Sequence, residues 1–371
     1  MARIVTVYNT SPQEWDPRDM SGIRWQKISE ALARLGHDVD IATHEARWQQ
    51  DPTPVPMGEA LRRVPLAGLK WPDYDVVKTL FDRGFETLTR FGGTRHPCVI
   101  SKLGSVVGPR DMPGIYFYGE VRQRLYDVQV KVHRTSHYVT LLSQPAIDLW
   151  RQIHGDRPGI LLVPGAADHD IPTPGPNPYA QIQAAKICLF SGNIYDPVSQ
   201  PEANRQLVHK LNQVGQALDG SGIRLCFQGR GDTSGLDARH VTDLGSCSYP
   251  DSWNYMQHAS AGLVVSAGAF MHNNESTKIY HYLRAGLPVV SEEGFPNDQV
   301  VRESGLGYLV SGEDMAGLAA RIEEACSRSW DRSHAVRYVL DRHTWDCRAR
   351  LYQPVIEEAL QRKANRRWWR R

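Results

Sequence analysis

The chain has 371 residues, 41% of them apolar and 23% charged, and its formal net charge is +2. This length is typical of two ordinary domains, and the nearly balanced charge argues against a nucleic-acid binder or another general polyanion binder. The six cysteines have no metal-ligand spacing, which indicates a reducing compartment with neither a disulfide framework nor a metal site.

The N-terminus has no signal-peptide pattern, because residues 3–7 go straight into a strand-like run. No window reaches 18 uninterrupted apolar residues, so we expect no membrane span. The sequence therefore predicts a cytoplasmic protein, and a peripheral position at the inner face of a membrane is left open.

The first half of the chain alternates strand-like and helix-like segments. Strands are expected at residues 4–8, 37–43, 73–77, 97–100, 114–118, 138–143 and 160–163, and helices at 22–35 and 144–154. Strands separated by helices predict an α/β domain with a doubly wound parallel sheet. We assign this Rossmann-like domain to residues 1–171.

A proline-rich segment then interrupts the pattern. Residues 172–181 carry prolines at every second position from 172 to 178, which suits neither a helix interior nor a central strand, so we expect a linker. The pattern resumes with strands expected at 187–190, 224–227, 261–265, 288–290 and 307–310, and helices at 202–218, 251–258, 276–285, 297–304 and 314–327. This second Rossmann-like domain spans 182–345. Two such domains suggest a cleft, with ligands at the carboxyl ends of the strands.

The most informative segment is 273–290. It begins polar, becomes an amphipathic helix, stops at a glycine and continues as a β-branched strand. A helix N-terminus offers backbone N–H groups and the positive end of the helix dipole, which suits a phosphate. Hydroxyls, an ammonium and a carboxylate follow one another at this start, in Glu275, Ser276, Thr277 and Lys278. The sequence predicts a site for a diphosphate and a sugar hydroxyl.

The end of this segment, 282–290, resembles the donor-binding signature of GT-B glycosyltransferases, specifically of the group 1 enzymes, which are similar to glycosyltransferase family 4. Weaker similarities lie at 32–39, 163–168, 189–193 and 343–346, so the resemblance covers roughly residues 1–360. It implies a GT-B fold that binds a nucleotide-sugar in the C-domain and an acceptor in the N-domain, without a metal or a separate cofactor. It also implies that residues 346–371 form a helix that crosses back to the N-domain and ends in a basic tail.

The chain departs from the family at four positions. Family members usually carry a Glu where this chain has His281, and often another at the position of Asn273. Their Arg and Lys after the first C-domain strand are missing from 191–196, which leaves Lys278 and Arg230 as the candidate cations. The ribose could be bound by Glu275 or by His281.

The resemblance and the residue chemistry together give a set of candidate site residues. Donor binding is assigned to Ser191, Gly192, Gly229, Tyr249, Asn274, Glu275, Ser276, Thr277, Lys278 and His281, acceptor binding to Gly22, Trp25 and Glu120, and catalysis to Glu120, Lys278 and Arg230. Tyr249 could stack on the base or be an ordinary surface residue. Glu120 could act as a general base, orient the acceptor, or form a structural ion pair.

Two further features carry alternatives. The Asp-x-Asp strings at 38–40 and 168–170 match a metal-binding spacing, but we expect no metal there. The tail, residues 361–371, has six positive charges and Trp368-Trp369, which suits an anionic membrane surface; the alternative is a solvated, frayed terminus.

The sequence thus favours a metal-independent hexosyltransferase of polysaccharide biosynthesis. It would move sugar from a UDP- or GDP-sugar to a hydroxyl of a glycan, a lipid-linked acceptor or a small molecule. A nucleotide-sugar epimerase, a glycan phosphorylase and a non-catalytic two-lobed binding protein are the alternatives.

Overall fold

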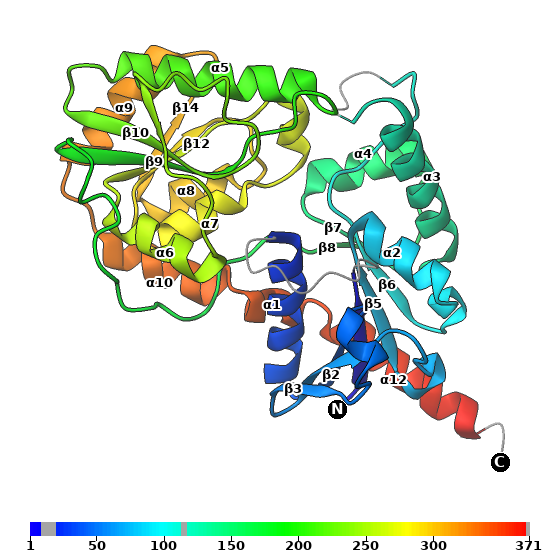
Figure 1. Cartoon of the computed structure of the whole chain (residues 1–371). Coiled ribbons are helices and arrows are strands. Elements are labelled where there is room, and N and C mark those ends of the chain that lie inside the picture. The colour runs from blue at the N-terminus through cyan, green and yellow to red at the C-terminus, as the bar shows by residue number, and fades with distance from the viewer. Residues whose placement is uncertain (9–19, 113–116, 369–371) are drawn as a thin grey trace. The chain divides into compact units, whose positions relative to one another are not determined.

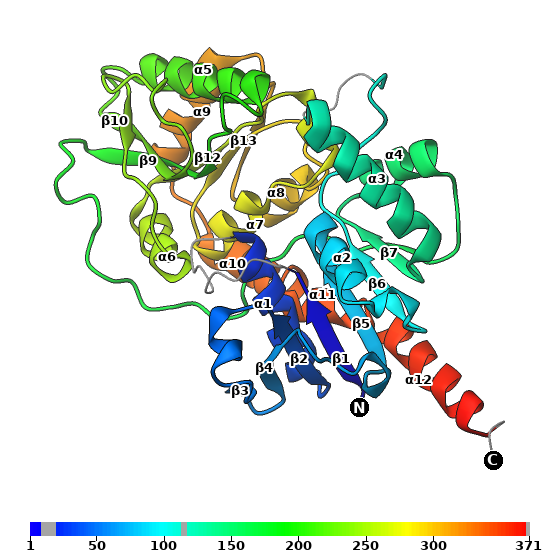
Figure 2. The same cartoon turned by 45° about the vertical axis from the view of Figure 1, so that its right-hand side comes forward.

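The computed structural model describes residues 1–8, 20–112 and 117–368, with side chains up to residue 365 (Figures 1 and 2). The chain forms two compact units. The first comprises residues 1–111, 119–164 and 345–371, and the second comprises 112–118 and 165–344. The chain passes between the units at 111/112, 118/119, 164/165 and 344/345, and the segment expected as a linker, 172–181, belongs to the second unit.

The first unit contains an eight-stranded sheet in the order β3-β4-β2-β1-β5-β6-β7-β8. Its strands are β1 (Arg3–Val7), β2 (Asp38–Thr43), β3 (Val55–Gly58), β4 (Leu61–Pro65), β5 (Val76–Leu80), β6 (Val99–Lys102), β7 (Tyr138–Leu141) and β8 (Ile160–Leu162). Every pairing is parallel except β3 with β4. The doubly wound parallel sheet predicted from the sequence is confirmed; the strand expected at 114–118 falls largely outside the described residues.

Helices cover both faces of this sheet. They are α1 (Met20–Arg34), α2 (Phe81–Arg90), α3 (Gly119–Thr135), α4 (Gln144–His154), α11 (Trp345–Arg350) and α12 (Gln353–Trp368), with short 3₁₀ helices η1 (Ala46–Gln49), η2 (Trp71–Asp73) and η3 (Gly93–Arg95). α2, α3 and α4 pack on the face that carries Val77 and Val139. α1 packs on the opposite face, where the indole N–H of Trp25 donates to Thr6 Oγ1 at 2.8 Å, and α11 packs against α1.

The second unit contains six parallel strands in the order β11-β10-β9-β12-β13-β14. They are β9 (Lys186–Asn193), β10 (Ile223–Arg230), β11 (Val241–Asp243), β12 (Ala261–Val264), β13 (Val289–Glu292) and β14 (Gly307–Val310). Five of the six were expected. β11 has only three residues, too few to show a hydrophobic period.

The helices of this unit are α5 (Pro201–Ala217), α6 (Tyr249–His258), α7 (Thr277–Arg284), α8 (Asp298–Ser304), α9 (Met315–Ser327) and α10 (Arg332–Arg342), with η4 (Ala269–Asn273). α5 and α9 pack together on one face of the sheet, and α7 packs with α10 on the other (Figure 1). α7 ends where Gly286 adopts a φ of +65°, a left-handed conformation that stops a helix with little strain in a glycine. The fold thus presents the start of α7 at the carboxyl edge of the second sheet.

No helix within the described ranges combines the length and the hydrophobicity that a bilayer-crossing segment requires.

Candidate functional site

The carboxyl ends of β9 and β10 lie side by side in the second unit. Gly192 is paired with Gly229, and Asn193 with Arg230. A Cβ atom on Gly229 would lie only 1.6 Å from the carbonyl oxygen of Gly192, so any side chain here would force the strands apart. Two of the glycines assigned to donor binding therefore face each other one residue before the ends of β9 and β10.

Lys278 brings a positive charge to this edge. Its Nζ lies 4.8 Å from the ring centroid of Phe190 on β9, and a Cβ atom on Gly192 would lie 3.0 Å from it. Arg230 is the last residue of the neighbouring strand. Lys278 on α7 and Arg230 on β10 thus both lie next to the carboxyl end of β9.

Ser191 ties these elements together. Its backbone N–H donates to the Tyr282 hydroxyl at 2.7 Å, and its own hydroxyl donates to Gln228 Oε1 at 2.8 Å. Tyr282 is fully buried, and burial raises the pKa of its hydroxyl far above the usual value, so it stays a neutral donor to the carbonyl of Leu189 at 3.2 Å. In the structure, Ser191 holds α7 against β9 and β10.

The start of α7 is partly engaged by the protein itself. The backbone N–H of Ser276 donates to Asn297 Oδ1 at 3.0 Å, and Asn297 Nδ2 donates back to the Ser276 carbonyl at 2.9 Å. Asn274 was also predicted to contact the donor, and its backbone N–H donates to the Met271 carbonyl at 2.9 Å. The Ser276 N–H, which was predicted to bind a phosphate, is thus already bonded to Asn297. The side chain of Lys278 therefore becomes the main candidate for binding the phosphate.

Glu275 also has partners within the chain. Its Oε2 accepts the N–H of Gly165 at 2.6 Å, and its Oε1 accepts the Tyr280 hydroxyl at 2.8 Å. A Cβ atom on Gly165 would lie 2.8 Å from the methyl group of Thr277, so the 163–168 turn packs closely on the helix start. A carboxylate can accept about four hydrogen bonds, so these two bonds do not prevent Glu275 from also accepting one from a ribose hydroxyl. The contact with a ribose stays a prediction.

His281 and Tyr249 meet on the side of α7 and α6. Their ring centroids are 5.7 Å apart in an edge-on arrangement, and His281 is buried. The Tyr249 hydroxyl donates to Asp168 Oδ2 at 2.9 Å, and burial together with the Asp168 charge raises its pKa above the usual range. Asp168 is also 3.8 Å from Arg284 Nη1. These contacts fix Tyr249, and its predicted stacking on a base is untested.

Both Asp-x-Asp strings are paired with cations. Arg62 binds Asp40 at 2.8 Å and Asp38 at 3.0 Å, and Arg284 contacts Asp168 and Asp170. Within the described ranges, no group of three or more His, Cys, Asp or Glu side chains is arranged to hold a metal ion.

The predicted acceptor residues lie in the first unit. Trp25 is part of the core between α1 and the sheet, and Gly22 is buried in α1. Glu120 is exposed in the first turn of α3, beside a hollow of about 520 Å³ that Arg110 and Arg124 also line. Of the three, only Glu120 presents a polar side chain to open space.

Sequence analysis missed a charged cluster around Glu292, the last residue of β13. Glu292 is buried and accepts bonds from Lys210 Nζ at 2.6 Å, from Ser266 N at 2.9 Å and from Ser266 Oγ at 2.6 Å, while His272 Nε2 lies 3.3 Å away. Burial acts to raise its pKa, but the bonds from Lys210 and Ser266 outweigh burial and lower it. The available signal was an acidic residue two positions after the strand predicted at 288–290.

Comparison with known proteins identifies the fold. No known protein family matches the sequence, and no curated protein does. Solved structures do: a sucrose-phosphate synthase from Thermosynechococcus elongatus (14% identity, TM-score 0.61, 100% of this chain and 99% of that one) and a glycosyltransferase from Rickettsia africae (11%, 0.64, 97% and 98%). The Anabaena protein HepE, solved in complex with UDP-glucose, also matches (12%, 0.61, 98% and 100%).

These structures are GT-B glycosyltransferases, and they align with almost the whole chain. The chain therefore has the GT-B fold, as the resemblance of segment 282–290 predicted.

Proposed function

We propose that this chain is a glycosyltransferase that binds a nucleoside-diphosphate sugar in its second unit and transfers the sugar to an acceptor hydroxyl. The observation that carries the proposal is the position of two cations at the carboxyl edge of the sheet: the Lys278 side chain of α7 lies beside Gly192 of β9, and Arg230 ends the neighbouring strand β10. Open parallel sheets bind ligands at that edge, and cations there suit a diphosphate.

The chemistry requires charge stabilisation. The bond between the anomeric carbon and the diphosphate oxygen breaks, the acceptor oxygen bonds to the same carbon, and the hydroxyl proton passes to a carboxylate base or to the departing diphosphate oxygen. Negative charge grows on the departing diphosphate, so a cation that binds it more strongly in the transition state accelerates the step. In our proposal Lys278 and Arg230 supply these charges, and transfer needs no added metal.

The donor is expected to be a UDP- or GDP-sugar. HepE, which shares the fold, was solved with UDP-glucose, so UDP-sugars are the first to test. The acceptor would be a hydroxyl of a glycan, a lipid-linked sugar or a small molecule, with Glu120 as its predicted carboxylate partner.

Nucleotide binding tests the donor site directly. Isothermal titration with UDP, GDP and TDP in the presence of a chelator should identify one nucleotide that binds the wild-type chain. Lys278→Ala and Arg230→Ala should each weaken this binding about tenfold or more, as loss of a charge-assisted contact predicts. Lys186→Ala is the matched control, because Lys186 starts β9 at the opposite edge of the sheet.

Three outcomes discriminate the alternatives. Unchanged affinity in both site variants would refute the site assignment. Tight binding without transfer to any acceptor, in a panel of glycans and lipid-linked sugars, would favour the non-catalytic binding protein. Turnover of the donor alone to an isomeric nucleotide-sugar would identify an epimerase.

A further inference from the structure

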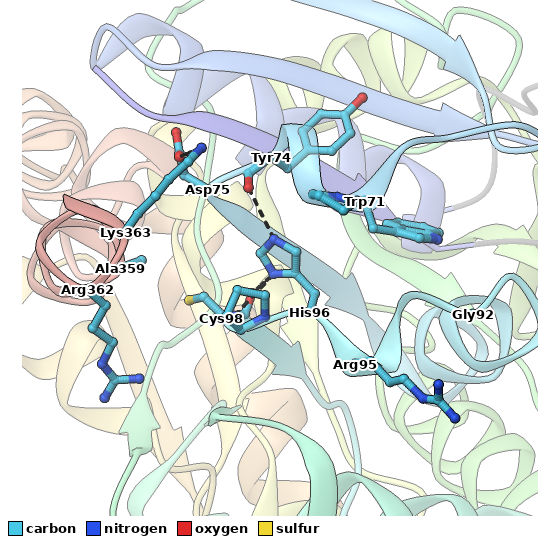
Figure 3. A pocket seen from close by; sticks show the side chains of 12 residues that line it. Trp71, Tyr74, Asp75, Gly92, Arg95, His96, Cys98, Ala359, Arg362 and Lys363 are labelled. Atoms are coloured by element: carbon cyan, nitrogen blue, oxygen red, sulfur yellow. Dashed lines mark hydrogen bonds and ion pairs between the residues drawn. The ribbon is translucent and has the colours of Figure 1, made fainter. Parts of the chain in front are cut away.

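A separate pocket of about 500 Å³ lies in the first unit, at the amino ends of β5 and β6 (Figure 3). Asp75 directly precedes β5, and Cys98 directly precedes β6. α12 forms one wall with Ala359, Arg362 and Lys363. Parallel sheets bind substrates at the carboxyl ends of their strands, so this pocket lies at the other edge and has no part in the proposed transfer.

The rim of the pocket is cationic. Arg95, Arg362 and Lys363 line it, against the single carboxylate of Asp75. Lys363 binds Asp75 at 2.5 Å, and Arg362 binds Glu358 at 2.5 Å in a pair whose side chains are 50% and 46% exposed. An exposed pair of this kind contributes little and is readily exchanged for another anion. Arg95 and Arg362 are both exposed at opposite sides of the opening (Figure 3).

The floor of the pocket is uncharged. Trp71 contributes apolar surface, and burial raises the pKa of the Cys98 thiol to about 12, which keeps it neutral. Burial also lowers the pKa of His96, although its bonds to the carbonyls of Tyr74 and Cys98 act in the opposite direction, so His96 adds no fixed charge. An uncharged floor below a cationic rim suits a molecule with an anionic group attached to an apolar body.

The composition of the C-terminal segment indicates a membrane as the source of such a molecule. Arg362 and Lys363 begin a run in which residues 361–371 carry six cations and two adjacent tryptophans. Clustered basic residues are attracted to anionic lipid surfaces at about 1 kcal/mol each, and tryptophans favour the headgroup region. Binding of a soluble phosphate ester would not require the basic, tryptophan-containing segment next to the pocket.

We propose that the pocket binds the phosphate headgroup of an anionic phospholipid, drawn in by the cationic rim of Arg95, Arg362 and Lys363, with the uncharged floor under the glycerol. α12 then holds the first unit at the surface of an anionic bilayer. This proposal concerns a site and a ligand outside the glycosyl transfer proposed above, and it stands or falls independently of that activity.

Vesicle binding tests the proposal with the full-length chain. The protein should sediment with vesicles of phosphatidylcholine and phosphatidylglycerol, and stay in solution with phosphatidylcholine alone. The double variant Arg95→Gln/Arg362→Gln should bind about tenfold or more weakly, since it removes two charges at the surface. Arg151→Gln is the matched control: Arg151 lies on α4 in the same unit, is 45% exposed and is similarly paired, and its loss should leave binding unchanged.

A second variant separates the pocket from general charge. Ala359→Leu fills the pocket from α12 without altering any charge, and it should weaken vesicle binding while the melting temperature stays that of the wild type. A tail variant, Arg366→Gln/Arg367→Gln/Arg370→Gln/Arg371→Gln, measures the contribution of the remaining cations.

Two results would overturn the proposal. One is wild-type vesicle binding by the pocket variants together with its loss in the tail variant, which would assign membrane contact to the tail alone. The other is stabilisation of the wild-type chain by millimolar glycerol 3-phosphate without any vesicle binding, which would assign the pocket to a soluble phosphate ester.

Discussion

The ammonium of Lys210 on α5 lies 2.6 Å from the carboxylate of Glu292, a residue only 4% exposed at the end of β13. The same carboxylate accepts the backbone N–H and the hydroxyl of Ser266, the second residue after β12. The pair therefore fixes the beginning of the loop that leads from β12 to the donor-site helix α7. Loss of one partner would leave a buried charge without its counter-charge, which is far more destabilising than loss of both.

We predict that Lys210→Met lowers the free energy of unfolding by about 3–5 kcal/mol, because the buried carboxylate of Glu292 loses the counter-charge of Lys210. Adding Glu292→Gln should restore part of the loss, since the amide can still bond Ser266 without carrying a charge. Urea unfolding of the two single variants and the double variant measures this coupling. A double variant no more stable than Lys210→Met would show that the pair is not the source of the effect.

The Glu292 cluster also shows where sequence reasoning stops. The start of α7 could be predicted because its polar entry, apolar period and terminal glycine are local features of residues 273–290. The partners of Glu292 are 82 and 26 positions away in sequence, and Asn297 reaches Ser276 across 21 positions. Such contacts between residues distant in sequence depend on how the strands and loops pack, so they cannot be predicted from a local sequence pattern.

The β3–β4 pair was missed for a different reason. β3 contains Pro56 and β4 ends at Pro65, and proline is depleted in strands because it cannot donate to the ladder. β3 is the edge strand of the eight-stranded sheet, where a missing donor is tolerated. The central strand β1 was predictable, since it is a short, mostly apolar run buried on both faces. The predictions at 73–77 and 97–100 overlap β5 and β6 only at their first two residues, because the polar residues that follow, Lys78-Thr79 and Ser101-Lys102, end the apolar signal.

Two substitutions of Glu275 should separate its structural contacts from ligand binding. Glu275→Ala loses the bonds to Gly165 N and to the Tyr280 hydroxyl, and we expect a loss of about 1–3 kcal/mol in the free energy of unfolding. Glu275→Gln keeps one acceptor oxygen and should lose less. If the carboxylate also binds the ribose, the Gln variant should weaken nucleotide binding out of proportion to its stability loss. Parallel changes in both measurements would limit Glu275 to holding the 163–168 turn.

Lys78 offers a test of stability against pH. It lies in β5 with 3% exposure, its Nζ is 5.1 Å from the ring centroid of Tyr352, and burial lowers its pKa to about 7. An unfolded lysine keeps its proton up to about pH 10.4, so between pH 7 and pH 10 the unfolded chain binds more protons than the folded one. The contribution of Lys78 therefore makes the chain more stable as the pH rises through this window.

Lys78→Met should remove that contribution. At pH 7 we expect the variant to be more stable by about 1–3 kcal/mol, because no ammonium has to be buried. The advantage should shrink as the pH approaches 10, and thermal unfolding at pH 7, 8.5 and 10 measures it. The exposed Lys131→Met is the control and should follow the wild type. A constant difference between Lys78→Met and wild type at all three pH values would contradict the assignment.

His154 should make the first unit sensitive to acid. Its ring centroid lies 4.2 Å from that of the fully buried Trp150 and 5.8 Å from that of His133, and burial lowers the pKa of His154 to about 4. Burial and the nearby charges of Arg157 and Arg134 lower the pKa of His133 as well. An unfolded histidine takes up its proton below about pH 6.5, whereas folded His154 does so only near pH 4. Stability should therefore fall as the pH drops from 6.5 towards 4.

His154→Phe keeps an aromatic ring on Trp150 but cannot take up a proton. We expect its melting temperature to decrease less than that of the wild type between pH 7.5 and pH 4.5, because one of the groups that binds protons on unfolding is gone. His209→Phe, at an exposed position of α5, is the matched control and should show the wild-type decrease. The difference between the two variants isolates His154 from the carboxylates that titrate in the same range, and equal slopes in both would show that the imidazole does not resist protonation in the folded chain.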